Sequence, residues 1–266
     1  MAKISPQALV DPAADLADDV EIGPFCIVGP EVKLAPGNRL LSHVVLTGDT
    51  TVGPGNTFHP HAVIGANPQD KKFRGESTRL IIGTQNTIRE AVTIHVGTAA
   101  GDGVTVIGDR NLLMVNCHIG HDCHVGNDCV LANNVMLAGH VVVGNNVVMS
   151  GGAASHHYLT IGEFAFVAGM ARLRRDVPPF VKVSDDDRIR AVNCEGMKRG
   201  GLSATEIEQI EEAARHLFFN REKPFAAALA DFDTRNGLPP RVKALVEFMH
   251  RRNSGKHGRY QEGKRR

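Results

Sequence analysis

The most regular feature of this chain is a large apolar residue at every sixth position. From Val10 the spacing holds without a break to Ile64. After two interruptions it resumes and continues to Val167, with Ser155 as an exception. The fourth residue after each of these anchors is mostly small or β-branched, as at Val20, Cys26 and Val32. A fixed short period predicts a repeat architecture in which successive turns of chain stack on one another.

One large and one small inward position per six residues suit a narrow triangular core. The pattern therefore predicts a mainly β fold, a parallel β-helix of hexapeptide repeats with three hexapeptides in each 18-residue coil. Cys117, Cys123 and Cys129 resemble a metal-binding series at first sight. They instead occupy the small inward slot on three different faces, so we expect them to pack in the core.

Two segments near 67–79 and 97–106 interrupt the period. Insertions in a repeat protein lie on one side and often build the binding face. Two consecutive prolines, Pro178 and Pro179, are expected to end the ladder pairing. The pattern predicts a β-helix over 1–190 and a second domain over 191–266.

The second domain is predicted to be small and α-helical. Ser203-Ala204-Thr205-Glu206 is a capping box that begins a first helix. Further helices fit Phe225 to Phe232 and Pro240 to Arg251, each with apolar residues at helical spacing. The chain ends in a basic tail, which we expect to be solvated and disordered. Its positive residues are Arg251, Arg252, Lys256, Arg259, Lys264, Arg265 and Arg266.

Composition and charge limit the partners and the cellular compartment to be expected. The 266 residues carry a formal net charge of +1, which gives no reason to expect nucleic acid as a partner. No apolar run approaches the roughly 20 residues that a membrane span needs, so no stable membrane insertion is expected. The N-terminus lacks the pattern of a signal peptide. We therefore expect a cytoplasmic protein with reduced cysteines.

The candidate chemistry lies in a group of histidines that the repeat itself places. Anchors Ile119, Leu137 and Ser155 are 18 residues apart, so they lie on one face of three consecutive coils. Their neighbouring histidines should stack along one edge of the prism and point outward. An aspartate directly follows the first of them, as suits a general base oriented by a carboxylate. Solvated surface histidines and a zinc site, as in a zinc-dependent hexapeptide hydratase, are the alternatives. The histidines are His121, His140, His156 and His157.

An ordered set of motifs along nearly the whole chain resembles the UDP-N-acetylglucosamine 3-O-acyltransferases of lipid A biosynthesis, a family of hexapeptide-repeat enzymes. The resemblance implies a left-handed β-helix. The motifs are Gly75-Glu76-Ser77-Thr78-Arg79, Asn111-Leu112-Leu113-Met114, His118-Ile119-Gly120-His121-Asp122-Cys123, Leu131-Ala132-Asn133-Asn134, Leu137-Ala138-Gly139-His140, Asp176-Val177-Pro178-Pro179 and Asn193-Cys194-Glu195-Gly196-Met197-Lys198-Arg199.

The resemblance implies direct transfer of a 3-hydroxyacyl group from acyl carrier protein to the 3-hydroxyl of UDP-N-acetylglucosamine, without a covalent acyl-enzyme, a cofactor or a metal. His121 would be the general base, Asp122 would orient it, and the backbone N–H of Gly139 would stabilise the oxyanion. The family also implies a homotrimer with active sites between neighbouring prisms.

Further roles are implied residue by residue. Gly169 falls where the family controls acyl-chain length, and a glycine there would leave room for a long chain. The alternative is that Gly169 is an ordinary glycine in a turn. The expected substrate-binding residues are Asp70 and Lys72 for sugar and acyl group, His118, His140, His156 and His157 along the edge, and Asn193, Glu195 and Arg199 for the nucleotide.

Three departures from the family pattern bear on the acceptor. His157 stands where the family usually has glutamine, and Gly200 stands where a second arginine often follows Arg199. The segment from Ser184 to Arg188 carries three carboxylates that the family usually lacks. They leave open N-acyl transfer to an amino-sugar nucleotide. A non-enzymatic scaffold is disfavoured, because it would not require an ordered histidine edge.

Overall fold

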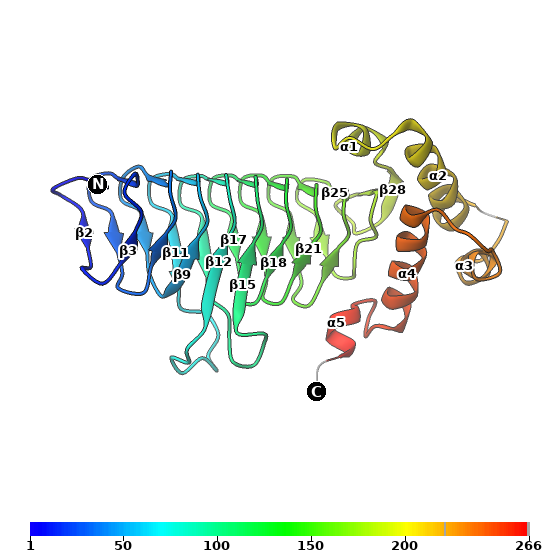
Figure 1. Ribbon diagram of the computed structural model, residues 1–266. Helices are drawn as coiled ribbons and strands as arrows, with labels where there is room; N and C mark the ends of the chain where they lie inside the picture. Colours follow the sequence, from blue (N-terminus) through cyan, green and yellow to red (C-terminus); the bar gives the residue numbers. More distant parts are fainter. Residues whose placement is uncertain (221, 265–266) are drawn as a thin grey trace.

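The computed structural model describes residues 1–220 and 222–264. Its strands follow one another around a prism of three sheets, and its helices gather at the C-terminal end of that prism (Figure 1). All strand pairs that form the three faces are parallel, with one antiparallel pair at the C-terminal end. The predicted β-helix followed by a small helical part is thus confirmed.

Each sheet collects every third strand, so one circuit of the prism takes one strand from each sheet. The first sheet contains β1 (Lys3–Ile4), β4 (Glu21–Ile22), β7 (Arg39–Leu40), β10 (Thr57–Phe58), β13 (Thr87–Ile88), β16 (Leu112–Leu113), β19 (Val130–Leu131), β22 (Val148–Met149), β25 (Phe166–Val167), β27 (Val181–Val183) and β28 (Ile189–Val192). The second contains β2 (Leu9–Val10), β5 (Ile27–Val28), β8 (Val45–Leu46), β11 (Val63–Ala66), β14 (Thr93–His95), β17 (His118–Ile119), β20 (Met136–Leu137), β23 (Ala154–Ser155) and β26 (Arg172–Leu173). The third contains β3 (Asp15–Leu16), β6 (Lys33–Leu34), β9 (Asp49–Val52), β12 (Arg79–Ile82), β15 (Val104–Ile107), β18 (His124–Val125), β21 (Val142–Val143) and β24 (Thr160–Ile161).

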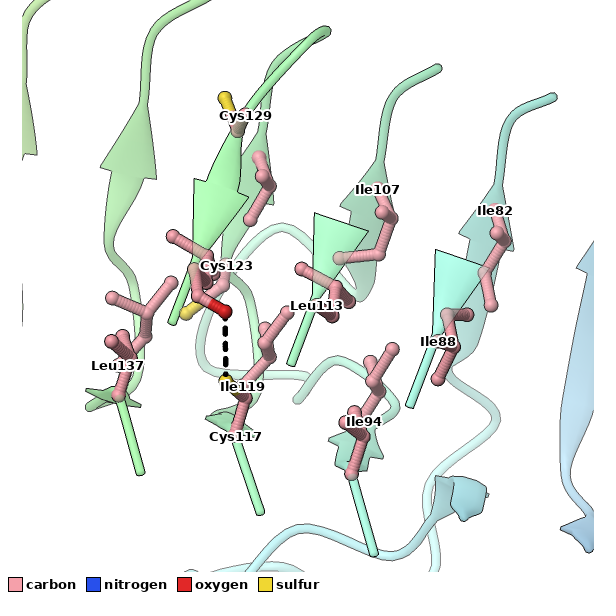
Figure 2. Packing of buried hydrophobic residues seen from close by; sticks show 14 of the residues in the cluster. Ile82, Ile88, Ile94, Ile107, Leu113, Cys117, Ile119, Cys123, Cys129 and Leu137 are labelled. Atoms are coloured by element: carbon pink, nitrogen blue, oxygen red, sulfur yellow. Dashed lines mark hydrogen bonds between the residues drawn. The ribbon is translucent and has the colours of Figure 1, made fainter. Parts of the chain in front are cut away.

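The core runs along the prism axis and consists of the predicted anchors and small slots. Every anchor from Ile22 to Val167 is buried, and only Val10 and Leu16 at the open N-terminal end are half-buried. Cys117, Cys123 and Cys129 lie among these isoleucines and leucines (Figure 2). The Cys117 thiol donates to the carbonyl oxygens of two residues on the next coil, and burial raises its pKa to about 11. The cysteines are therefore core residues, as predicted.

A ladder of buried asparagines follows one corner of the prism. In each step a side-chain Oδ1 accepts a hydrogen bond from the backbone N–H of the equivalent residue one coil on. The ladder thus satisfies the polar backbone where the chain turns and cannot form regular strand pairs. It runs through Asn38, Asn56, Asn86, Asn111 and finally the N–H of Cys129.

Replacing Asn86 by alanine is expected to lower the free energy of unfolding by about 3 kcal/mol, because it leaves several buried polar groups without partners. Asn86 Nδ2 donates to Asn56 Oδ1 and to the Gly108 carbonyl, while its Oδ1 accepts from the Asn111 N–H. Urea denaturation followed by circular dichroism would measure the loss. The matched control is Asn133→Ala at an exposed corner, which should change stability by less than about 0.5 kcal/mol.

The two insertions project on the same side of the prism, below β12 and β15 in Figure 1. The first occupies residues 67–78, between β11 and β12, close to its predicted bounds. The second ends at Gly103, within its predicted bounds near 97–106. Residues 104–106 belong to β15, which pairs with four residues of β12 because the alternating apolar pattern already resumes there.

The prolines do not end the ladder, contrary to prediction. Val177 forms a bridge with Ile161, and β27, which begins two residues after Pro179, pairs in parallel with β25. Pairing continues because the two prolines lie between these contacts, at a corner, where no ladder N–H is needed. β27 then turns into β28 as an antiparallel pair, which leads the chain into the helices.

The helices are α1 (Cys194–Arg199), α2 (Ala204–Ala214), the π-helical η1 (Arg215–Phe219), α3 (Phe225–Asp233), α4 (Pro240–Ser254) and α5 (Tyr260–Gly263). The capping box at Ser203 is confirmed, with Ser203 and Glu206 bonded reciprocally. A second core joins Phe164 and Phe180 of the prism to Met197, Ile210 and residues of α3 and α4. The helical part therefore packs on the prism end, while the exact domain boundary at 190/191 stays a prediction.

The basic tail is ordered as far as Lys264, so the expectation of a disordered tail is wrong for the described residues. Arg259 is buried, donates to the Arg174 carbonyl and pairs with Glu262. The Tyr260 N–H donates to Asp176. The tail folds because its arginine finds a carbonyl partner far away in sequence; Arg265 and Arg266 lie outside the described residues. Within those residues, no helix is long and apolar enough to cross a membrane.

Candidate active site

The 18-residue register sets two columns of side chains along one corner of the prism. Strands β17, β20 and β23 pair with Ile119 opposite Leu137 and Leu137 opposite Ser155. The second residue after each anchor forms one column and the third residue forms the other. The first column contains His121, Gly139 and His157. The second contains Asp122, His140 and Tyr158.

His121 and Asp122 form a hydrogen-bonded pair in this corner. His121 Nδ1 lies 2.8 Å from Asp122 Oδ2. An ionised carboxylate can only accept, so the proton of a neutral His121 must reside on Nδ1. That tautomer leaves Nε2 with a free lone pair, and the side chain is 18% exposed. The pair is thus arranged as a base whose proton acceptor faces outward.

Asp122 is buried yet fully hydrogen-bonded. Its backbone has φ of 58°, a left-handed corner conformation that aspartate tolerates better than most residues. Thr98 donates to Oδ1 from its N–H and to Oδ2 from its hydroxyl, at 3.0 and 2.6 Å. Burial acts to raise the pKa of this carboxyl, but the hydrogen bonds from His121 and Thr98 outweigh it, so the pKa is lowered. Asp122 is therefore held ionised beside His121.

His140 lies on the other side of the same carboxylate. Its Nδ1 is 3.7 Å from Asp122 Oδ2, and its ring meets that of His121 edge-on with centroids 5.0 Å apart. Tyr158 stacks on His140 with centroids 4.3 Å apart and an interplanar angle of 6°. The predicted stack of histidines on one edge is thus observed, and it continues into Tyr158.

Gly139 packs directly against the His121 ring. A Cβ built on this glycine would come 2.6 Å from Cε1 and Nε2 of His121. Within residues 1–220 and 222–264, its backbone N–H donates to no other group, while its carbonyl accepts from Tyr158. A free N–H beside the outward-facing nitrogen is thus available to a bound molecule.

His118 begins β17 on the second sheet, next to a histidine that the sequence did not single out. The Nδ1 of His118 lies 2.8 Å from Thr93 Oγ1, and its ring meets the buried ring of His95 with centroids 4.9 Å apart. Burial, followed by the nearby charge of His118 and His121, lowers the pKa of His95 to about 4. Burial and the His121 charge lower that of His118 as well. Both residues therefore line the site as neutral imidazoles near neutral pH.

His156 and His157 follow β23, two coils beyond His118 and His121. Their rings are 3.9 Å apart, and His156 Nδ1 is 3.1 Å from the His157 carbonyl oxygen. His157 also meets Tyr158 edge-on, with centroids 5.4 Å apart. Through Tyr158 and His140 the pair connects to His121, so the structure brings together all the predicted edge histidines.

The remaining predicted residues lie elsewhere within this chain. Asp70 accepts from the Lys72 N–H in the first insertion. The buried Asn193 caps α1 and donates to the Phe164 carbonyl. No described contact joins Asp70, Lys72 or Asn193 to His121.

Glu195 and Arg199 lie on α1, with 3.7 Å between their charged atoms. Gly169 lies against the previous coil, with Gly151 O 3.4 Å from the position of an added Cβ.

Two of the three unusual carboxylates of residues 184–188 are paired with arginines of the same chain. Asp186 binds Arg190 at 2.9 Å and lies 3.4 Å from Arg188, and Asp187 lies 3.4 Å from Arg175. These pairs offset most of the added negative charge locally, so the departure from the family pattern does not by itself disfavour a diphosphate ligand.

A metal ion is the alternative use of the corner. His121, Asp122 and His140 each offer a ligand atom within 4.8 Å of the others. In the described residues, Oδ2 of Asp122 already accepts from His121 and Thr98. A metal bound there would have to break those hydrogen bonds, so the donor set fits an oriented base better than a zinc site with three free ligands.

An open cleft of about 750 Å³ adjoins the corner, between the second insertion and α5. It is lined by the second insertion (Ala100, Gly101, Asp102), the prism (Asp122, His124, His140, Val142, Tyr158) and the C-terminal segment (Gln261, Lys264). Tyr158 follows its anchor by three residues, as Asp122 and His140 do, so the same counting identifies it from sequence. Thr98 and His95 carry no such signal, because they depend on the path of an insertion.

Comparisons with known proteins show the family of this chain. The profile of a family described as "Udp N-acetylglucosamine O-acyltransferase; Domain 2" matches residues 176–258, and one described as "Bacterial transferase hexapeptide (six repeats)" matches residues 104–139. The acyl-[acyl-carrier-protein]–UDP-N-acetylglucosamine O-acyltransferase of Xanthomonas campestris is 48% identical over 92% of this chain and 94% of that protein. The corresponding protein of Myxococcus xanthus is 50% identical over 82% and 85%.

Solved structures are similar to this chain over most of its length as well. The UDP-N-acetylglucosamine O-acyltransferase of Moraxella catarrhalis superposes with a TM-score of 0.87 at 41% identity, covering 92% of this chain and 95% of that one. The UDP-N-acetylglucosamine acyltransferase of Bacteroides fragilis superposes with a TM-score of 0.88 at 34% identity, covering 93% and 96%. The chain belongs to the family of acyl-[acyl-carrier-protein]–UDP-N-acetylglucosamine O-acyltransferases.

Proposed function

We propose that this protein transfers a 3-hydroxyacyl group from acyl carrier protein to the 3-hydroxyl of UDP-N-acetylglucosamine, the first step of lipid A biosynthesis. The observation that carries the proposal is the His121–Asp122 pair, whose geometry leaves Nε2 of His121 as an outward-facing base. The substrates are inferred from the family, and the type of reaction is inferred from the geometry of the His121–Asp122 pair.

In the proposed reaction, His121 Nε2 takes the proton of the sugar hydroxyl while its oxygen attacks the thioester carbonyl. The new C–O bond forms a tetrahedral oxyanion, which the Gly139 N–H stabilises. The C–S bond then breaks, and the departing thiolate receives the proton from His121. Asp122 stabilises the imidazolium during the transfer because its carboxyl stays ionised.

The substrate-binding residues would come from two copies of the chain. Asp70, Lys72, Asn193, Glu195 and Arg199 make no contact with His121 within one chain, as expected if a neighbouring prism in a homotrimer supplies them. The second sheet supports this arrangement, because its outward positions include the exposed apolar side chains of Leu9, Ile27 and Met136.

A transfer assay tests the proposal. Purified protein is mixed with 3-hydroxyacyl carrier proteins of several chain lengths and either UDP-N-acetylglucosamine or its 3-amino analogue, and products are identified by mass spectrometry. We expect an alkali-labile ester on UDP-N-acetylglucosamine. Transfer only to the amine would instead establish N-acylation. Metal analysis of the same protein separates both outcomes from zinc-dependent hydration.

Replacing Gly169 by methionine is expected to shift the preferred acyl chain to a shorter one. The added side chain would begin in contact distance of Gly151 on the previous coil and project along the surface where the resemblance places the chain end. We expect at least a tenfold loss of kcat/KM for the longest good substrate, since each buried methylene is worth about 0.8 kcal/mol. Equal losses for all chain lengths would contradict a role for Gly169 in chain selection. Gly29→Ala, at a position with room for a Cβ, is the control.

A further inference from the structure

Thr98, in the second insertion, makes more hydrogen bonds to the Asp122 carboxylate than any other described residue. Its N–H binds Oδ1 at 3.0 Å and its hydroxyl binds Oδ2 at 2.6 Å. Thr98 is itself only 4% exposed. The carboxylate that orients His121 is therefore held mainly by a loop outside the hexapeptide repeat.

The insertion is built around this threonine. The Thr98 carbonyl accepts from the N–H groups of Gly101 and Gly103, which closes a tight turn over residues 98–103. At the neck of the loop, Gly97 donates to the Arg79 carbonyl and Arg79 donates to the Gly103 carbonyl. Because Arg79 begins β12, the loop is fixed to the prism on both sides.

The backbone of the 98–103 turn also lies in close contact with the Asp122 carboxylate. A Cβ on Gly101 would come 2.4 Å from Cγ and Oδ1 of Asp122, so only glycine fits at that position. Thr98 and Gly101 together enclose the carboxylate opposite His121. Asp122 is thereby shielded from water on the side away from the base.

A buried carboxylate needs these donors for its task. One hydrogen bond from His121 would leave most of the acceptor capacity of Asp122 unsatisfied, and a buried charge without partners is costly. Two further donors from Thr98 keep the charge in place and fix the orientation of Oδ2 toward Nδ1 of His121.

We propose that Thr98 is a positioning residue for acyl transfer, which acts by holding Asp122 ionised and aimed at His121. The role of the second insertion is then to bring Thr98 to the base. This inference rests on the proposed function, because it assigns Thr98 a part in the same His121–Asp122 unit.

The first test compares Thr98→Val, which keeps the N–H and the shape but loses the hydroxyl, with Thr98→Ser, which keeps both donors. We expect Thr98→Val to lower kcat about 10- to 100-fold with KM changed by less than about twofold. Thr98→Ser should restore at least a third of wild-type kcat. Ala99→Ser, at the exposed next position, is the loop control and should match the wild type.

A second test separates positioning from general support of the fold. In a His121→Ala background, Thr98→Val should not lower the residual transfer rate further, because residues that act as one unit are not additive. Gly101→Ala, which forces a methyl against the carboxylate while Thr98 stays, should behave in the same way. It keeps the test decisive if Thr98→Val fails to fold.

The outcomes are distinct. Wild-type kcat in both Thr98→Val and Gly101→Ala would overturn the proposal, and so would full additive losses in the His121→Ala background. Absence of acyl transfer by the wild-type protein would instead overturn the proposed function, whatever the variants show.

Discussion

Replacing His121 by alanine is expected to reduce kcat for acyl transfer by about 10³-fold, since general-base assistance contributes roughly 10²- to 10⁴-fold. The ring supplies the lone pair on Nε2 that must take the proton of the attacking hydroxyl, and no other described histidine is bound to Asp122 as closely. Single-turnover measurement of ester formation, with protein in excess, would give the chemical rate directly.

Two controls make the His121 result specific. His250→Ala removes an exposed histidine that pairs with Asp233 in the helical part, and it should leave kcat unchanged. The thermal unfolding temperature of the His121→Ala variant should lie near that of the wild type, because the ring is partly exposed and lies outside the apolar core. Undiminished transfer by His121→Ala would exclude it as the base and direct attention to His140.

The positions of the histidines were predictable because they depend only on the period. Once Ile119, Leu137 and Ser155 are known to be 18 residues apart, every neighbour at a fixed offset must share an edge, whatever its chemistry. The same counting applies to Tyr158, whose stacking on His140 is its observed consequence. In a repeat protein, the spacing of residues in the sequence thus predicts which distant residues are neighbours in the fold.

The insertions are where this inference fails. A bulge between Ile64 and Ala66 shifts the pairing of β11 with β14, so β14 extends to His95, whose ring is buried against that of His118. Thr98 reaches Asp122 only because the following turn closes on its carbonyl. Neither contact follows from a period, since each depends on loop conformation and on a partner in another coil.

The ordered tail shows the same limit for charged residues. A run of arginines and lysines is usually solvated, and nothing local distinguishes Arg259 from its neighbours. Its burial depends on the Arg174 carbonyl and on Glu262, and Asp176 fixes the segment through Tyr260. Burial of a charged side chain requires such specific partners, which only the folded chain brings together.

Replacing Gly139 by alanine is expected to lower kcat about 100-fold or more, although it adds only one methyl group. The methyl would start 2.6 Å from Nε2 and Cε1 of His121, closer than non-bonded atoms approach, so the imidazole must rotate or shift. Either movement breaks the alignment of Nδ1 with Asp122 and displaces the base by a fraction of an ångström to an ångström, a misplacement that can cost about 10²-fold.

The effect should be confined to the chemical step. Because Gly139 is not among the positive-φ glycines, alanine imposes no backbone strain there, and the corner should fold with near-wild-type stability once the partly exposed His121 ring has moved. Gly29→Ala, where the nearest atoms are 3.5 Å or more from the added carbon, controls for the substitution itself and should leave kcat unchanged. If Gly139→Ala kept full activity, the tight packing of Gly139 against His121 would have no role in acyl transfer, and the base would tolerate a displaced ring. A loss of stability without a loss of kcat would assign the glycine to folding alone.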